Sequence, residues 1–418
     1  MKERKPDMRF KGYEDSWIEK PFGEVFDTLS NNTLSRDKLN YDAGSIMDVH
    51  YGDILIKFGE ILDTEKEGLP FITNDADAEK YQAAFLRDGD IVVADTAEDE
   101  TVGKCTEICN VGDKKILSGL HTIPYRSKDG FATGFLGYYL NSGKYHDKLL
   151  PLMQGVKVTS ISKSGLNETN VIYPKSKKEQ ALIGGFLFAL DEKINSESIV
   201  CEKLKILKKA MLGKMFPSNG SRIPEIRFSG FTEPWEQRKL LDISDIVTGT
   251  TPPTKDKDNY DGNRLFVSPA DIQGNRFIER TITTLTEKGH ALGRELRPGT
   301  SLFVSIGSTI GKVAQIEEFA TTNQQINAVI PYDKMEDDFV FTMLENEVDK
   351  IKKMSAQQAV PIINKSTFGN IEVKYPKKEE QMKIGKYFKE LDHLITLHQQ
   401  KVGKLINIKS ACMRRLFV

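Results

Sequence analysis

The sequence predicts a mixed α/β fold made of two copies of one domain, each copy followed by a long helix. The first copy begins with Pro6-Asp-Met-Arg-Phe-Lys-Gly12 and then Trp17. The same pattern returns 218 residues later as Pro224-Glu-Ile-Arg-Phe-Ser-Gly230 and Trp235. This period is far longer than the ~20–50 residues of a solenoid repeat, so the pattern indicates a duplicated domain.

The ends of the two copies repeat as well. Tyr173-Pro-Lys175 with Glu179-Gln180 returns as Tyr375-Pro-Lys377 with Glu380-Gln381, and the register then holds to the end of the chain. Between these shared ends lie short runs of β-branched and apolar residues bounded by Gly, Asp or Pro, which predict strands. We expect strands at residues 53–58, 90–94, 301–305 and 326–330, and helices at residues 135–150 and 338–354.

The two terminal segments predict long helices with a coiled-coil seam. Their apolar positions advance by alternating steps of four and three, which is a heptad repeat without an interrupting proline. The seam is broken at equivalent places by Glu197 and His398, and by Lys208 and Lys409. A plain amphipathic helix packed on its own domain is the alternative. The predicted interface residues are Ile183, Leu187, Leu190, Ile194, Leu204, Met211, Ile384, Phe388, Leu391, Ile395, Val402 and Leu405.

Composition places the chain among ordinary globular proteins. Its 418 residues are 39% hydrophobic and 28% charged, with 59 Lys+Arg against 60 Asp+Glu, which excludes a binder that works by bulk positive charge. Four scattered cysteines argue against a disulfide scaffold and for a reducing compartment. The N-terminus has no signal-peptide core and no apolar run reaches the ~20 residues of a membrane span. We therefore expect a cytoplasmic protein without a membrane contact.

Motifs of catalysis and cofactor binding are not convincing. Residues 307–313 resemble a phosphate-binding loop but are one residue short and lack its Ser or Thr, so a Gly-rich turn between strands fits better. Glu372-Val-Lys374 has the spacing of many metal-dependent nucleases, although a strand leaving the domain explains it better. Cys105 and Cys109 lack the second ligand pair of a zinc site. The chain is therefore expected to bind no metal or cofactor and to be a binding protein, not an enzyme.

The loops of the second copy suggest DNA as the ligand. Residues 250–257, 273–276 and 322–325 are rich in Thr, Lys, Asn, Gln and Arg. Such side chains contact base edges in the major groove and phosphates, although solvated loops have the same composition. Residues 60–113 of the first copy are instead rich in acids, including Glu98-Asp-Glu100. We expect that surface to face away from DNA or towards a partner.

Together these features resemble the specificity subunit of Type I restriction–modification systems. The resemblance rests on the Pro-x-(Met/Ile)-Arg-Phe-x-Gly motif with its Trp, the stretch Arg297 to Lys312, Thr322-Asn-Gln-Gln325 and the Tyr-Pro…Glu-Gln pattern at each helix start. It covers essentially the whole chain and is better in the second half. The first half keeps Arg87-Asp-Gly-Asp90 and Gly103-Lys104, without a clear Gly-Ser-Thr-Ile-Gly or Asn-Gln-Gln equivalent.

The resemblance implies a domain plan. Residues 1–172 and 217–374 would be two target-recognition domains, each reading one half of a split, asymmetric site in double-stranded DNA. Residues 173–216 and 375–418 would be helices paired as an antiparallel coiled coil, giving a pseudo-twofold molecule and setting the gap between half-sites at about one to one and a half DNA turns. In an antiparallel pair, Glu197 and His398 fall in neighbouring layers and could therefore touch; the alternative is that both turn to solvent.

The resemblance also implies partners and DNA contacts. Methylation subunits would bring AdoMet, and a restriction subunit would bring ATP and magnesium, while this chain would recognise DNA without catalysis. The residues predicted to contact DNA are Lys57, Lys104, Lys163, Thr251, Lys255, Lys257, Gln273, Arg276, Ser308, Thr309, Lys312, Asn323, Gln324, Gln325 and Lys365.

Three other functions stay open from the sequence. The chain could be a duplicated DNA-binding regulator that acts without a methyltransferase. It could be a metal-dependent nuclease that uses Glu372 and Lys374, or a coiled-coil scaffold that does not bind DNA.

Overall fold

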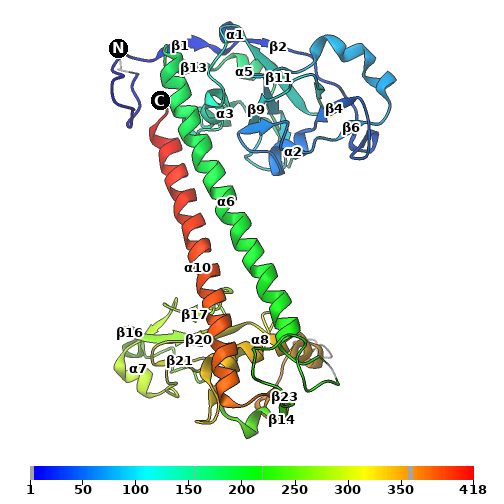
Figure 1. Ribbon diagram of the computed structural model, residues 1–418. Helices are drawn as coiled ribbons and strands as arrows, with labels where there is room; N and C mark the ends of the chain where they lie inside the picture. The colour runs from blue at the N-terminus through cyan, green and yellow to red at the C-terminus, as the bar shows by residue number, and fades with distance from the viewer. Residues whose placement is uncertain (1–3, 156, 219, 356–360) are drawn as a thin grey trace. The chain divides into compact units, whose positions relative to one another are not determined.

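The chain folds into two compact units that each contain parts of both long helices. The computed structural model describes residues 4–155, 157–218, 220–355 and 361–418. The first unit comprises Met1–Ser196 and Val402–Val418, and the second comprises Glu197–Lys401. The long helices α6 (Lys177–Met215) and α10 (Lys378–Arg415) therefore each contribute residues to both units (Figure 1). Among the helices described, none combines the length and the apolar character needed to cross a membrane.

The first unit contains a five-stranded and a four-stranded sheet. The five-stranded sheet has the order β2 (Phe26–Thr28), β11 (Thr122–Ser127), β7 (Ile91–Ala94), β9 (Cys105–Cys109), β5 (Ile61–Asp63). The four-stranded sheet has the order β10 (Lys115–Ser118), β4 (Ile46–Val49), β6 (Phe71–Ile72), β3 (Leu39–Asn40). Two short pairs join β1 (Ile18–Pro21) to β13 (Asn170–Tyr173) and β12 (Thr159–Ser160) to β8 (Thr96–Ala97). Its short helices are α1 (Phe22–Val25), α2 (Tyr51–Ile56), α3 (Phe135–Leu140), α4 (Gly143–His146) and α5 (Lys163–Asn167).

The second unit repeats this plan with a smaller second sheet. Its five-stranded sheet has the order β15 (Ser244–Thr248), β22 (Ile326–Pro331), β19 (Ser301–Val304), β20 (Val313–Ile316), β17 (Phe277–Ile278). A three-stranded sheet orders β18 (Thr284–Leu285), β16 (Tyr260–Val267), β21 (Ala320–Thr322), and β14 (Glu236–Lys239) pairs with β23 (Glu372–Tyr375). Its shorter helices are α7 (Glu287–Ala291), α8 (Asp337–Ser355) and α9 (Lys365–Gly369).

The repeated sequence motifs join the start of each unit to a long helix. Arg9 makes two hydrogen bonds to the buried carboxylate of Glu179, at 2.7 and 3.0 Å, and Arg227 makes the same pair to Glu380, at 2.6 and 2.7 Å. Bidentate Arg–carboxylate contacts fix orientation as well as distance. The neighbouring tryptophans, Trp17 and Trp235, are buried in the two equivalent cores. The motifs are therefore explained by packing.

The core of the first unit combines both ends of the chain. Residues of β1, β11 and α3 pack there with Cys412, Leu416 and Phe417. The Phe417 ring lies 6.0 Å from that of Phe135 and 5.7 Å from that of Tyr139. A backbone hydrogen bond from Met8 N to Arg415 O, 2.9 Å long, joins the N-terminal segment to the end of α10. Residues 402–418 thus belong to the first unit, and Cys412, Leu416 and Phe417 are part of its core.

The coiled-coil prediction is confirmed. Every predicted seam residue of α6 and α10 is buried or half-buried. In the second unit, Glu197 contacts His398 at 2.7 Å, and Lys208 contacts Asp392 at 2.6 Å. Higher numbers on one helix meet lower numbers on the other, so the helices are antiparallel. The predicted contact between Glu197 and His398 is present, and Lys401 adds an ion pair to Glu197 at 2.6 Å.

The strands expected at 90–94, 301–305 and 326–330 and the helix at 338–354 are confirmed by β7, β19, β22 and α8. The strand expected at 53–58 is wrong, because those residues form most of α2. The His50 ring caps α2 by accepting the Gly52 N–H at 3.2 Å, and a short apolar run does not by itself distinguish helix from strand.

The helix expected at 135–150 is interrupted and forms α3 and α4 instead. The Asn141 side chain turns back to the Gly137 carbonyl at 2.7 Å and to the Cys105 carbonyl at 2.8 Å. The Ser142 hydroxyl donates to Tyr139 O at 2.6 Å. These polar side chains compete for the backbone groups that a continuous helix would use.

Candidate nucleic-acid interface

Three loops of the second unit meet at one edge of its five-stranded sheet. Thr248 at the end of β15 pairs with Asn327, and Val304 at the end of β19 pairs with Ile326, both at the start of β22. The loop after β15, the loop after β19 and the loop before β22 must therefore lie together. We call this set, residues 249–255, 305–312 and 323–325, the second-unit loop cluster.

Side chains connect these loops directly. The Thr251 hydroxyl donates to Gln324 Oε1 at 2.6 Å. Asn323 and Gln325 bond each other twice, since Asn323 Nδ2 donates to Gln325 Oε1 at 3.1 Å and Gln325 N donates to Asn323 Oδ1 at 3.1 Å. Thr251 and Gln324 are exposed, whereas Asn323 and Gln325 are half-buried. The arrangement holds amide groups at the surface, which suits base-edge recognition.

Two glycines shape the loop between β19 and β20. Gly307 has φ 98° and Gly311 has φ 86°, a region that residues with a Cβ rarely adopt. This confirms a Gly-rich turn between strands in place of a phosphate-binding loop. Ser308 is exposed on the turn, and Thr309 and Lys312 are half-buried beside it. The loop cluster therefore brings Thr251, Ser308, Thr309, Lys312, Asn323, Gln324 and Gln325 together, with Lys255 exposed at its margin.

Arg276 is a correction to the predicted interface. Its side chain is 1% exposed, and its guanidinium pairs with Asp338 at 2.6 Å and Asp392 at 3.3 Å. It also donates to Gln315 Oε1 at 2.9 Å. A guanidinium enclosed by these acceptors has no face for DNA, so Arg276 is a structural residue. The polar composition of its loop suggested a DNA contact and gave no sign of the two aspartates that α8 and α10 supply.

The other predicted basic residues are spread over both units. Lys57, Lys163, Lys257 and Lys365 are exposed, as is Gln273, whose side chain bonds the Ala270 carbonyl. Lys163 and Lys365 occupy equivalent positions at the starts of α5 and α9. The Lys104 ammonium is held by Leu55 O at 3.0 Å, and burial lowers its pKa. Lys104 is therefore engaged inside its unit.

The first unit has a counterpart of the Gly-Ser-Thr-Ile-Gly-Lys loop that the sequence comparison missed. Ala94 N donates to Lys104 O and Gly103 N to Ala94 O, and Val304 N donates to Lys312 O and Gly311 N to Val304 O, all at 2.9 Å. Thr101-Val-Gly-Lys104 therefore matches Thr309-Ile-Gly-Lys312. The first-unit loop is two residues longer and carries Glu98-Asp-Glu100, which hides the match in the sequence.

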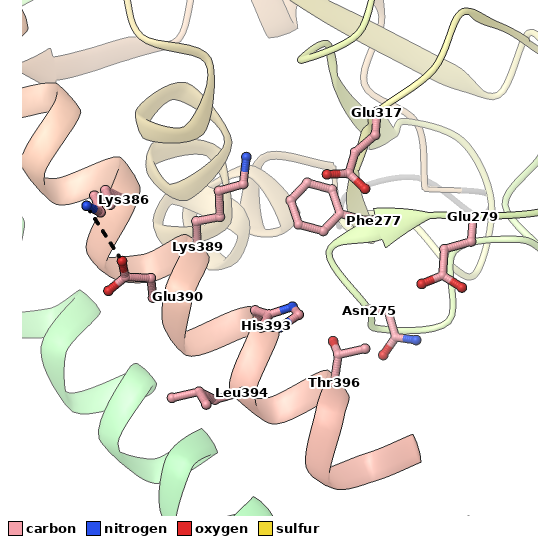
Figure 2. Close-up of a pocket in the computed structure, with 10 residues that line it drawn as sticks. All are labelled: Asn275, Phe277, Glu279, Glu317, Lys386, Lys389, Glu390, His393, Leu394 and Thr396. Carbon is pink, nitrogen blue, oxygen red and sulfur yellow. Dashed lines mark ion pairs between the residues drawn. The ribbon is translucent and has the colours of Figure 1, made fainter. Parts of the chain in front are cut away.

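A groove lies beside α10 in the second unit. Figure 2 shows it between Lys386, Lys389, His393 and Leu394 of α10 and the segment that carries Asn275 and Phe277, with a volume of about 820 Å³. The Lys389 ammonium lies 5.3 Å from the centre of the Phe277 ring and 3.3 Å from Asp338. The lining mixes both charges with apolar surface. Such a lining suits a protein segment better than a reacting substrate.

The nuclease alternative lacks the geometry it needs. Glu372 accepts a hydrogen bond from Gln237 at 2.8 Å, and Lys374 donates to Ser218 O and Ser221 O at 3.1 and 2.7 Å. Both side chains are thus engaged in joining β23 to its neighbours. Within the described ranges, no group of three or more His, Cys, Asp or Glu residues could hold a metal ion.

Comparison with known proteins gives a match to a family model in the second half of the chain. Residues 232–406 match the family model described as Type I restriction modification DNA specificity domain. The Type I restriction enzyme MjaIX specificity subunit of Methanocaldococcus jannaschii is 31% identical over 38% of this chain and 38% of its own length. The HindI specificity subunit of Haemophilus influenzae is 32% identical over 35% of this chain and 32% of its own length. The matches thus span about a third of these relatives.

The fold extends the similarity to the whole chain. The crystal structure of a Type I restriction-modification system S subunit from M. genitalium has a TM-score of 0.68 and covers 99% of both chains, at 16% sequence identity. At that identity the likeness is one of fold. Residues 232–406 thus carry a Type I restriction modification DNA specificity domain, and the whole chain, with its duplicated units and paired helices, is similar in fold to a Type I S subunit.

Proposed function

We propose that this chain is the DNA sequence-recognition subunit of a Type I restriction–modification complex, working in the cytoplasm. In this proposal each unit reads one half of a bipartite, asymmetric site. The observation that carries it is the duplication of one α/β unit whose loops gather at the same sheet edge. In the second unit that edge presents Thr251, Gln324 and Gln325, whose side chains suit base edges.

In the same proposal the chemistry belongs to partner subunits. Methylation subunits would supply AdoMet, and a restriction subunit would supply ATP and magnesium chemistry. The long helices are suited to docking, because they carry many exposed apolar side chains outside the coiled-coil seam, a feature of interaction surfaces. These are Leu182, Phe186, Ile199, Val200, Ile206, Leu207, Met382, Leu394, Leu397, Ile406 and Ile408.

The central test is to sequence the methylome of cells that express the methylation subunits with and without this chain. A bipartite methylated motif that appears only with the chain would support the proposal. Replacing residues 21–155 by another such domain should change one half of the motif and spare the other. Binding to a specific site without any methylation subunit would favour the stand-alone regulator. Magnesium-dependent cleavage lost in Glu372→Ala would favour the nuclease.

Single substitutions separate base reading from phosphate binding. Gln324→Ala and Gln325→Ala should each relax discrimination in the second half-site by ~1–3 kcal/mol for a lost bidentate contact. Lys255→Ala should weaken binding to all sequences and flatten the salt dependence. Unchanged specificity in both glutamine variants would move base reading to other loops.

The docking surface is tested with Ile206, whose side chain is 67% exposed. Ile206→Glu should abolish co-purification with the methylation subunits, because it places a charge in an apolar contact. The melting temperature of the isolated chain should not change, since the residue lies outside the seam. Lys203→Glu is the matched exposed control and should co-purify normally. Retained co-purification of Ile206→Glu would place the docking surface elsewhere.

A further inference from the structure

The first unit has a loop at the position of Asn323-Gln-Gln325 that the sequence does not show. Asp95 N donates to His121 O at 3.1 Å, and Ser305 N donates to Gln325 O at 2.8 Å. Asn32 N donates to Ser118 O, and Thr250 N to Thr322 O, both at 2.8 Å. Gly119 N donates to Val49 O and Asn323 N to Val267 O, at 3.0 and 3.1 Å. These bonds align Gly119-Leu-His121 with Asn323-Gln-Gln325.

His121 stands out in this loop. It has φ 55°, a left-handed conformation that costs energy for a residue with a side chain and that is concentrated at functional sites. Its side chain is nevertheless 48% exposed, so burial does not explain the choice of residue. Gln325, its counterpart, is among the residues predicted to read bases. A strained, exposed histidine at this position therefore has a functional explanation.

The surroundings hold the His121 ring in place. The Tyr51 ring packs edge-on against it with centroids 5.3 Å apart, and His50 supports Tyr51 at 4.7 Å. Beneath the loop, the buried Asp48 carboxylate accepts a 2.6 Å hydrogen bond from Asn32. A Cβ at Gly119 would lie only 2.4 Å from Asp48 Oδ1, so only glycine lets the loop lie this close. Such support favours a defined geometry over a loose surface side chain.

The hydrogen bonds around the ring define what it can recognise. The Thr96 hydroxyl donates to Asp95 Oδ1 at 2.7 Å, so its oxygen is free to accept from His121 Nδ1, 3.4 Å away. The Asp95 carboxylate is also 3.5 Å from Nδ1. Two acceptors beside Nδ1 favour the tautomer that carries its proton there, which makes Nε2 a hydrogen-bond acceptor. Within the described part of the chain, no hydrogen bond occupies Nε2.

We infer that His121 is a specificity-determining residue of the first unit and that its Nε2 accepts a hydrogen bond from an exocyclic amino group in the major groove. The bases that offer one there are adenine, through N6, and cytosine, through N4. Thr96 and Asp95 are positioning residues that set the tautomer. Glu98–Glu100 continue the same loop, so under this inference the expectation that this acidic stretch faces away from DNA does not hold. The inference rests on the proposed function, since it names where the first half-site is read.

The experiment expresses the full chain with its methylation subunits and reads the methylated motif of the cell by sequencing. His121→Ala should relax one position of the first half-site, with discrimination there falling about 10- to 100-fold, and leave the second half unchanged. His121→Gly provides a folding control, because glycine suits the left-handed backbone and should preserve or raise stability while removing the ring. Gln325→Ala is the matched variant of the other unit and should alter only the second half.

Positioning by Thr96 is tested with a conservative pair. Thr96→Val should relax the same position as His121→Ala, and Thr96→Ser, which keeps the hydroxyl, should restore it. An unchanged first half-site in both His121 variants would overturn the inference while leaving the proposed function intact. Absence of any motif that depends on the wild-type chain would overturn both. The two failures are thus distinguished by the wild-type sample alone.

Discussion

Removal of the Lys208 ammonium should destabilise the second unit strongly. Lys208 lies on the seam of α6 with a side chain 11% exposed, and it contacts Glu345 Oε1 and Asp392 Oδ1, each at 2.6 Å. Asp392 retains Arg276 at 3.3 Å when the lysine is replaced, but Glu345 loses its cation. Glu345 is 26% exposed in its side chain, so water compensates in part. We expect Lys208→Met to cost about 3 kcal/mol, the lower end for an orphaned buried charge.

The two tryptophans make the measurement specific. Trp17 lies in the first core and Trp235 in the second, and the chain has no others. In a Trp17→Phe background, the fluorescence of Trp235 reports urea unfolding of the second unit alone. The control is Lys205→Met on the same helix, because Lys205 is exposed and its ion pair is with Glu202, three residues away, at 2.7 Å. Its cost should stay below about 0.5 kcal/mol.

A double variant and a pH series identify the cause. Lys208→Met/Glu345→Gln should recover at least about 1 kcal/mol relative to Lys208→Met, because the uncompensated charge is gone. Burial already raises the pKa of Glu345, and loss of the lysine should raise it further. A carboxyl whose pKa is raised in the folded state contributes to the free energy of unfolding while it is protonated, and this contribution is lost as the pH rises through that pKa. Lys208→Met should therefore be more destabilised at pH 8 than at pH 5. If Lys208→Met behaved like Lys205→Met at both pH values, the reasoning would be refuted.

Three further predictions use the same chain. Burial raises the pKa of both Asp48 and Glu107 to about 7. In a Trp235→Phe background, the free energy of unfolding of the first unit should therefore fall by roughly 1.4 kcal/mol per pH unit and per group as the pH rises from about 5 to 7. A flat profile would contradict this. Leu391→Asp should cost several kcal/mol by burying a lone charge in the seam, measured by the same fluorescence as Trp235, with the exposed Leu394→Asp nearly neutral. Inserting one heptad into each long helix adds ~10 Å and should lengthen the preferred gap between half-sites by ~3 base pairs in a selection from randomised gaps; an unchanged optimum would mean that partner subunits set the gap.

Features that follow a periodic pattern of apolar residues were predictable from the sequence. The heptad seam gave the coiled coil, its interface residues and even the contact between Glu197 and His398, because helix periodicity fixes which side chains share a face. The apolar run at 53–58 carried no such period over its short length, and its helical state depends on the His50 cap. Local sequence decides these elements only where the pattern is long enough.

The candidate interface was predictable only in part. The second-unit loops were visible through their composition, whereas the equivalent first-unit loops carry Glu98-Asp-Glu100 and His121 in place of Gly, Ser and Gln. Their equivalence appears only in backbone pairing between distant strands. The predicted DNA contact of Arg276 was wrong because its partners, Asp338 and Asp392, lie more than sixty residues away in the sequence. Tertiary contacts of this kind leave no local signal.

The order of synthesis has a consequence for a chain with this core. The first unit needs Cys412, Leu416 and Phe417 to fill its interior, yet these residues are translated more than two hundred residues after Ser196, where the first stretch of that unit ends. Translation at ~5–20 residues per second delays them by roughly 10 to 40 s after residue 196. Glu197–Lys401, the whole second unit, is translated during that interval. The half that is made first therefore lacks part of its core while the second half is translated, and we expect this open core to be a surface that a chaperone or an arriving partner can meet on the nascent chain.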